Sequence, residues 1–330
     1  MAFVPELMKS GITVRVAEKS FSLTGENFEA GSLIVTRRNN ESIPDYDRTI
    51  QNLAQKLDRK MFTSGTGFVS KGKDVGAEAV KYLKPPKVAV LFGEQTFPLS
   101  AGETWHFFEQ QIHYPITQIG TDYFDNVELS KYTVLIIPEG SYKNISEEQL
   151  NRITTWVSKG GRLIVIGEGL NLFADKKGYG LKVYATDSEK NEAEREEKQL
   201  KEKELLRRYE DAERYEVSNM ISGAIYKVTV DSSHPLAFGI EDNYYTLKTD
   251  ELRFAFLEKG WNVGVIKGPA KPIQGFAGKH VNKKMDNSLV FGVEEKGDGH
   301  VVYLVDNPIF RSFWETGKMI FSNAVFMVGQ

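Results

Sequence analysis

The pattern of apolar and polar positions changes near residue 85, where short apolar runs begin to alternate with stretches of helical periodicity. Four of these runs are Lys87–Gly93 (KVAVLFG), Thr133–Gly140 (TVLIIPEG), Arg162–Gly169 (RLIVIGEG) and His300–Asn307 (HVVYLVDN). Near-continuous Val, Ile and Leu indicates strands that are covered on both faces. We therefore predict an α/β fold, with a flavodoxin-like, mostly parallel sheet and helices on both of its faces. Later apolar runs predict further strands, some of them antiparallel at the sheet edge.

Two capping boxes mark helix starts. In a capping box, the first side chain accepts a hydrogen bond from the backbone N–H three positions later, and the side chain at that later position accepts one from the backbone N–H of the first residue. One is formed by Ser146 with Gln149, and the other by Ser100 with Glu103. Both precede apolar residues at helical spacing. A third amphipathic helix is predicted over residues 320–328, with one face docked on the sheet.

The first 84 residues have a different pattern. Short β segments at Ile12–Ala17 and Ser32–Thr36 precede apolar residues at helical spacing and a Gly-rich stretch. We place a boundary at Pro85-Pro86. This division gives a small α+β segment at residues 1–84, followed by the α/β domain at residues 85–330.

A charge-dense run at about 188–216 interrupts the α/β domain. Opposite charges stand four residues apart at Glu194 and Lys198, Glu197 and Lys201, and Glu204 and Arg208. Such pairs support an exposed helix, so we predict a solvated helical insertion. A docking arm is the alternative, in which the sparse apolar residues contact the domain or a second subunit; these are Leu200, Leu205, Leu206 and Tyr209.

Composition limits the partners. The 330 residues include 42 Lys and Arg against 45 Asp and Glu, a net charge of −3 without a basic stripe, so we predict neither a nucleic-acid nor a membrane partner. No apolar run approaches the roughly 18 residues of a spanning helix. The absence of cysteine excludes disulfides and a thiol nucleophile but fits several compartments. The start lacks the features of a signal peptide, and it would also suit a segment of a longer polypeptide.

Several phrases together resemble one family. These are VRVAEKSFSLTGENFEAGSLIV, LFGEQTFPLSAGETWHFFEQQIHYPIT, YTVLIIPEG, WVSKGGRLIVIGEG, DSSHPLAFG and GHVVYLVDNPIFRSFW. They are similar to the C-terminal part of bacterial zinc carboxypeptidase-like proteins of the carboxypeptidase A superfamily. The resemblance implies a class I glutamine amidotransferase-like domain that follows a peptidase domain, and an exported parent protein that is a metallocarboxypeptidase. The peptidase domain itself is lacking from this sequence.

The chain departs from working amidotransferases at the turn Gly167–Leu170, where the family pattern places a cysteine. A later His-x-Glu pair is also missing. We therefore expect no glutamine hydrolysis and assign no catalytic residue and no cofactor.

One motif invites a metal assignment. His106 and Glu109 form H-x-x-E, and His234 lies at a distance that would suit a third zinc ligand. However, His106, Glu109 and His113 fall on the polar flank of a predicted amphipathic helix, and a motif without its structural context is weak. We predict no metal site. His234 precedes Pro235, which favours a turn over a ligand-facing histidine. The four tryptophans, Trp105, Trp156, Trp261 and Trp314, are interpreted as core or interface residues.

The better candidate site is at the strand ends, because parallel sheets bind ligands outside their carboxyl ends. The candidate ligand-binding residues are Gly93, Glu94, Glu139, Gly140, Ser141, Glu168, Gly169, Asn171, Asp306, Asn307 and Arg311. Clustered carboxylates would repel an anion and would suit a hydroxylated or cationic ligand. The alternative is that these residues only cap helices and loops.

Three functions remain open at this point. We favour a non-catalytic accessory and binding domain of a zinc carboxypeptidase-like protein, which would serve substrate presentation, domain packing or oligomerisation, with an upstream peptidase domain as its partner. A second possibility is a hydrolase that uses the strand-end carboxylates on a small polar or carbohydrate-like substrate. A third is a purely structural domain that forms a homodimer.

Overall fold

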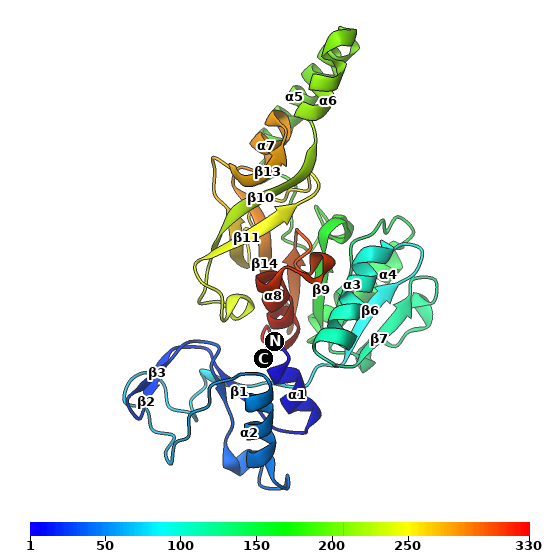
Figure 1. Ribbon diagram of the computed structural model, residues 1–330. Helices are drawn as coiled ribbons and strands as arrows, with labels where there is room; N and C mark the ends of the chain where they lie inside the picture. Colours follow the sequence, from blue (N-terminus) through cyan, green and yellow to red (C-terminus); the bar gives the residue numbers. More distant parts are fainter. Residues whose placement is uncertain (207) are drawn as a thin grey trace.

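A ten-stranded mixed sheet forms the centre of the molecule in the computed structural model, which describes residues 1–206 and 208–330 (Figure 1). The strand order is β11-β10-β12-β14-β15-β9-β8-β6-β7, and β13 pairs with β10 beside β12. One half of this sheet is parallel and the other half is antiparallel.

The parallel half confirms the predicted fold class. Its strands are β7 (Ile116–Gly120), β6 (Val88–Phe92), β8 (Val134–Ile137), β9 (Arg162–Ile166) and β15 (Gly299–Leu304), in this spatial order. Numbered along the chain, the order is 2-1-3-4-5, which is the flavodoxin-like arrangement of a doubly wound sheet. The carboxyl ends of these five strands consequently lie at one edge.

The antiparallel half is larger than the edge strands that the sequence suggested. It contains β14 (Ser288–Lys296), β12 (Trp261–Ile266), β10 (Ile221–Val230), β11 (Asn243–Lys248) and β13 (Pro272–Ala277). Buried and more exposed positions alternate along β10 and β11, as expected for strands with one covered face. The hairpin β14–β15 joins the two halves.

Helices cover both faces of the parallel half. α8 (Glu315–Phe326) and the π-helix Phe107–Gln111, which continues α3 (Pro98–His106), pack on one face, and α4 (Glu147–Ser158) packs on the other. Alternate residues of β6 feed the two cores, with Val88 and Val90 in one and Ala89 and Leu91 in the other. This burial on both faces accounts for the continuous apolar runs.

One predicted capping box is confirmed and the other is wrong. At α4, Ser146 Oγ accepts a bond from the Gln149 backbone N–H (3.2 Å) and Gln149 Oε1 accepts from the Ser146 N–H (2.9 Å). α3 instead begins at Pro98, because the fixed φ of proline suits the first turn. Ser100 therefore lies inside the helix, where its hydroxyl oxygen accepts a bond from the Glu139 N–H (3.1 Å).

The N-terminal residues form two small antiparallel sheets and two helices. The elements are α1 (Phe3–Lys9), β1 (Arg15–Ala17), β2 (Phe21–Leu23), β3 (Glu26–Phe28), β4 (Leu33–Ile34), α2 (Tyr46–Lys56) and β5 (Val80–Tyr82). Strand β1 lies between β4 and β5, and β2 pairs with β3. Leu7, Val14 and Leu83 belong to the same apolar core as α8. The division at residue 85 stays a prediction, and the two parts share one core.

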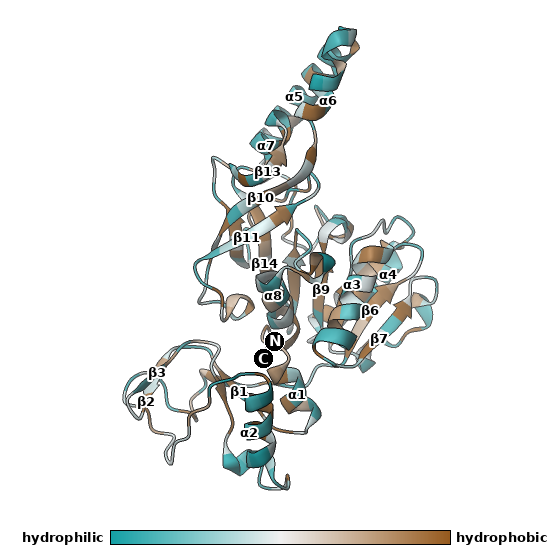
Figure 2. Cartoon of the chain, viewed as in Figure 1, coloured by the Kyte–Doolittle hydropathy of each residue, from teal (hydrophilic) through white to brown (hydrophobic). Residues whose placement is uncertain are grey.

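The charge-dense run is helical and projects from the antiparallel half (Figures 1 and 2). α5 (Asp187–Leu205) buries none of its residues, α6 (Ala212–Ser218) contacts α7 (Lys279–Lys284), and Lys283 of α7 pairs with Glu196 of α5 at 3.1 Å. Glu197 pairs with Lys201 at 2.7 Å, as predicted. Arg207, within the predicted insertion, lies outside the described residues.

Short 3₁₀ turns complete the described structure. They are η1 (Arg37–Asn39), η3 (Phe124–Asn126), η4 (Leu129–Lys131), η5 (Gly167–Leu172), η6 (Tyr209–Asp211), η7 (Pro235–Ala237) and η8 (Phe310–Ser312). Within residues 1–206 and 208–330, no helix has the length and apolar character needed to cross a membrane.

Candidate functional site

The loops that follow β6, β8 and β9 touch one another at the carboxyl edge of the parallel strands. Thr96 and Gly140 form a β-bridge between the first two loops. A Cβ atom added to Gly167 would lie only 2.5 Å from Glu139 Cγ, so the loop after β9 runs directly beside the Glu139 side chain. The predicted neighbourhood of strand ends therefore exists, with Glu139 at its centre.

Glu139 and Glu103 both accept hydrogen bonds from the side-chain amide of Asn307. The Asn307 Nδ2 group donates to Glu103 Oε2 at 2.7 Å and to Glu139 Oε2 at 3.2 Å. Glu103 Oε1 also accepts from the backbone N–H of Arg311 at 2.7 Å. One side-chain amide thus holds two carboxyl groups from different elements, α3 and the loop after β8.

Burial raises the pKa of Glu139 to about 7. The nearby charges of Asp250 and Glu103 act in the same direction, whereas the hydrogen bonds from Asn307 and Ser100 oppose the shift. Near neutral pH this carboxyl group can consequently both hold and release a proton. A hydrogen-bonding or acid-base role is therefore chemically open to it.

Asp306 has a different environment. Its Oδ1 pairs with Lys248 Nζ at 2.7 Å and its Oδ2 accepts from Thr246 Oγ1 at 2.6 Å. The side chains of Lys248 and Asp306 are 0% and 7% exposed, and Lys248 Nζ also donates to the Leu252 carbonyl oxygen. Asp306 thus holds the antiparallel strand β11 against the end of β15, and its charge is neutralised within the fold.

Arg311 does not pair with Asp306, because Lys248 occupies that position. The Arg311 guanidinium instead lies 5.1 Å from the ring centre of Phe310. Arg311 and Ser312 both have left-handed backbone conformations, with φ of 48° and 57°. This tight turn directs the Arg311 N–H toward Glu103.

The remaining predicted residues lie around this centre. Glu94, Ser141, Glu168 and Asn171 are exposed to solvent, as is Gly93, whereas Gly140 and Gly169 are buried. A Cβ atom on Gly140 would lie 2.2 Å from the Gln95 carbonyl oxygen, so glycine is required for the close approach of the two loops. The structure therefore brings together Glu139, Asp306 and Asn307, and it leaves the exposed residues as surface groups of the same edge.

Three residues of the edge are absent from the predicted site: Glu103, Lys248 and Asp250. The sequence pattern assigns Glu103 to a capping box instead. The sequence pattern could have identified Lys248 as a buried residue, because Tyr244, Thr246 and Lys248 alternate along β11 and share its buried face. Asp250, whose pKa is raised by burial and then by Asp306, follows that strand in a loop.

Aromatic side chains border the carboxyl edge. Phe97, whose N–H donates to the Glu139 carbonyl oxygen, is 41% exposed, and Phe313 is 54% exposed. Phe313 contacts Phe310 and Trp314 through ring faces and edges at centroid distances of 6.0 and 5.5 Å. Of the other tryptophans, Trp156 is buried as predicted, whereas Trp105 and Trp261 are 41% and 52% exposed and are not core residues; an interface role for them stays a prediction.

The histidines of the H-x-x-E motif have other partners. His106 Nδ1 lies 3.1 Å from Ser312 Oγ, and the π-helix that continues α3 ends at Gln111, so His113 lies beyond the helix. His234 Nδ1 accepts from the Leu236 N–H at 3.0 Å and caps the turn at Pro235, which confirms the predicted turn. Burial lowers the pKa of His234 to about 4. Among the described residues, no three His, Asp or Glu side chains are grouped to hold a metal ion.

Comparisons with known proteins give only distant similarities. No family model and no curated protein matches the chain. A ThuA-like protein of Bacteroides uniformis is 12% identical, with a TM-score of 0.44 over 72% of this chain and 89% of that one. A glutamine amidotransferase of Thermotoga maritima is 9% identical, with a TM-score of 0.40 over 73% and 96%. A GH42 β-galactosidase of G. stearothermophilus is 13% identical, with a TM-score of 0.34 over 93% and 38%. At these levels we base function only on the residues of this chain.

Proposed function

We propose that this chain is a non-catalytic ligand-binding module of a larger protein, and that its ligand binds at the carboxyl edge formed by Glu103, Glu139, Asn307 and the adjoining loops. The observation that carries the proposal is the Asn307 amide held between two carboxyl groups. No hydrogen bond or ion pair found among the described residues joins Glu139 to a cationic side chain. A partly buried carboxyl without a cation favours neutral partners such as hydroxyl groups.

The chemistry of the edge favours a neutral, polyhydroxylated ligand. Carboxyl groups accept hydrogen bonds from hydroxyls, and an amide both donates and accepts. An anionic ligand would be repelled by Glu103 and Asp250. Exposed rings such as Phe97 and Phe313 offer apolar faces beside these polar groups, which is the usual composition of small-molecule sites.

The non-catalytic assignment is supported by the lack of a suitable nucleophile. The chain has no cysteine, and the turn at Gly167–Leu170 carries none of the thiol chemistry of amidotransferases. The Ser100 hydroxyl, which is close to Glu139, accepts a bond from the Glu139 N–H and lies on a buried residue. A binding role needs no such group.

We further propose that the larger protein is zinc carboxypeptidase-like, with a peptidase domain upstream of residue 1. The support is the set of sequence phrases that resemble that family. The module would then present substrate to the peptidase or pack against it. Reading the coding frame upstream of Met1 tests this part: a frame without a peptidase domain would contradict it.

Binding is tested by isothermal titration calorimetry with a panel of neutral mono- and oligosaccharides. We expect a sugar of this panel to bind, and Asn307→Ala to weaken it at least tenfold, because the shared amide is lost. Glu109→Gln, an exposed carboxylate of the neighbouring π-helix, serves as control and should bind normally. Failure of every sugar, together with a stable dimer in light scattering, would favour the purely structural alternative.

One observation favours a second candidate, a hydrolase. Glu139, with its pKa of about 7, lies beside Glu103, and such a pair can supply a general acid and a base. If the chain is a hydrolase, chromogenic glycosides should be cleaved, and Glu139→Gln and Glu103→Gln should each reduce kcat at least a hundredfold. Cleavage that is as fast in both variants as in the unmodified chain would assign the activity to a contaminant and exclude this candidate.

A further inference from the structure

A groove that runs along α4 shares none of its lining residues with the proposed ligand site. It has a volume of about 670 Å³ and runs between α4 and the segment that connects β7 to β8. Thr133, Gly160 and Gly161 close its base at the amino ends of β8 and β9. This volume is within the range of about 300–1,000 Å³ that is typical of ligand sites. We call it the α4 groove.

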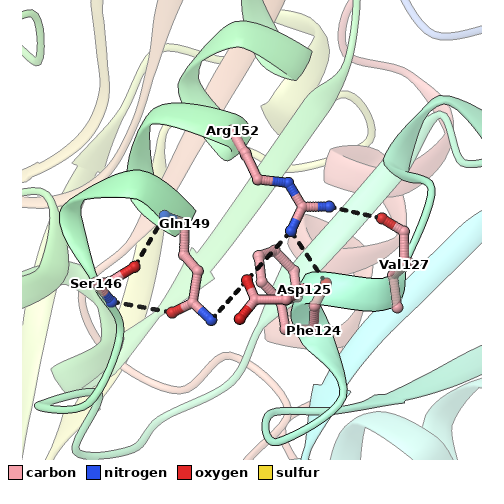
Figure 3. A network of polar contacts seen from close by, with 6 residues as sticks. All are labelled: Phe124, Asp125, Val127, Ser146, Gln149 and Arg152. Atoms are coloured by element: carbon pink, nitrogen blue, oxygen red, sulfur yellow. Dashed lines mark hydrogen bonds and ion pairs between the residues drawn. The ribbon is translucent and has the colours of Figure 1, made fainter.

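One wall of the α4 groove is fixed in place by a polar network (Figure 3). Arg152 donates to the Val127 carbonyl oxygen at 2.8 Å and to the Phe124 carbonyl oxygen at 3.4 Å, and its guanidinium lies 3.3 Å from Asp125 Oδ1. Gln149 Nε2 donates to the same Asp125 oxygen at 2.9 Å. The groove is therefore formed before any ligand binds, which lowers the entropic cost of binding.

The floor of the groove is apolar, and a hydrogen bond from Trp156 fixes it in place. Leu129 and Trp156 are 6% and 8% exposed, and the Trp156 Nε1–H donates to the Tyr132 carbonyl oxygen at 3.1 Å. A ligand that lies along this floor must present apolar side chains toward it.

Four exposed polar residues line the groove along one face of α4: Glu148, Asn151, Thr155 and Lys159. Over the described part of the chain, none of these side chains has a hydrogen-bond or ion-pair partner. Glu148 is in the first turn of the helix and Lys159 is its C-cap. A negative and a positive side chain therefore lie at the two ends of the groove. Their Cα atoms are about 16 Å apart along the helix axis.

We propose that the α4 groove binds a short, extended peptide with free termini. The ammonium group of its N-terminus pairs with Glu148 and the carboxylate of its C-terminus pairs with Lys159. An extended chain spans about 3.3 Å per residue, so about five residues fit between the two charges. Asn151, midway along the helix face, can both donate to and accept from the peptide backbone. Apolar peptide side chains cover Leu129 and Trp156.

The test uses the full chain and the pentapeptide Ala-Leu-Tyr-Leu-Ala in four forms: free, N-acetylated, C-amidated and doubly blocked. Binding is measured by titration of backbone amide signals in NMR. We expect the free form to bind at low salt and to shift the signals of Thr133, Asn151 and Gly160. Each blocked terminus should weaken binding about three- to fivefold, because an exposed ion pair contributes up to about 1 kcal/mol.

Matched variants assign each terminus to its side chain. N-acetylation of the peptide should cause no further loss of affinity for the Glu148→Gln variant. C-amidation of the peptide should likewise cause no further loss of affinity for the Lys159→Met variant. Glu147→Gln and Lys143→Met change exposed neighbours outside the groove and should behave as the unmodified chain does. Lys159→Met should also leave sugar binding at the carboxyl edge unchanged.

Three results would overturn the proposal. They are equal affinity of free and doubly blocked peptide, signal shifts confined to residues away from the groove, and no binding at peptide concentrations of about 1 mM. Each result is independent of sugar binding, so failure here leaves the proposed function standing.

Discussion

The carboxyl edge of the parallel sheet and the α4 groove differ in how their charged side chains are engaged. At the carboxyl edge, Asp306 and Lys248 are almost completely buried and neutralise each other, and Glu139 is held beside Glu103 by the Asn307 amide. Along α4, Glu148 at the start of the helix and Lys159 at its end stay in water at the two ends of the α4 groove.

This difference separates charges that hold the fold from charges that remain free for a partner. The position of an edge in a parallel sheet predicts where a ligand site is expected. Burial decides whether the charged groups there are already engaged. Substitutions of buried charged groups should therefore change stability much more than substitutions of exposed ones.

The largest effect is expected at the buried ion pair. Lys248→Met leaves the Asp306 carboxylate buried without its cation, which should lower the free energy of unfolding by about 3 to 5 kcal/mol. The measurement is denaturation in urea at neutral pH. The double variant Lys248→Met/Asp306→Asn removes both charges and should recover most of the loss. If the double variant is no more stable than Lys248→Met, the cost does not come from the uncompensated charge.

A smaller, pH-dependent effect is expected at Glu139. Its pKa is about 7 in the folded protein, against an ordinary value of 4.5, so the folded state binds the proton more tightly. The contribution of Glu139 to the free energy of unfolding is therefore fully present below about pH 4.5. It is lost as pH rises through 7, and the total loss is up to about 3 kcal/mol.

Glu139→Gln keeps the hydrogen-bond acceptor for Asn307 and cannot ionise. This variant should be more stable than the unmodified chain at pH 8, and the gain should shrink toward zero at pH 5. Denaturation at both pH values measures it. A gain that is equal at the two values would show that ionisation of Glu139 is not its cause.

The wall of the α4 groove should show an intermediate effect. Arg152→Ala removes hydrogen bonds to Phe124 and Val127 and the contact with Asp125, and it should cost about 1 to 2 kcal/mol. Arg195→Ala, on the exposed helix α5, is the control and should change stability little. A loss no greater than that of the control would mean that the wall does not depend on Arg152.

The smallest effect is expected at Glu168. This carboxylate is exposed at the carboxyl edge, so Glu168→Gln should change stability by less than about 0.5 kcal/mol. If it contributes to the proposed site, sugar binding should change nonetheless, which calorimetry detects. A large loss of stability would instead identify Glu168 as a structural cap.

Much of the carboxyl edge is predictable because it depends on local patterns. Apolar strands that end in acidic turns are enough to place Glu139, Asp306 and Asn307 at one edge. The α4 capping box is equally local, since Ser146 and Gln149 are only three residues apart. The α3 box fails because Pro98 offers a better helix start two residues earlier.

The α4 groove could not be predicted in this way. Arg152 and Asp125 are distant in sequence, and nothing in either segment indicates that they meet. Glu103 and Asn307 are likewise joined only by the packing of α3 against the loop after β15.

The sequence by itself determined the parallel core, its two covered faces and the acidic strand ends, because periodicity and turn residues act over a few positions. Only the tertiary structure decided which of those acidic groups are neutralised. Three strands separate β11 from β15 in the sheet, yet Thr246 and Lys248 of β11 contact Asp306 after β15. The antiparallel half must curl back to allow this contact, and the curvature of a twisted sheet arises from all of its strands together, so no local pattern encodes it.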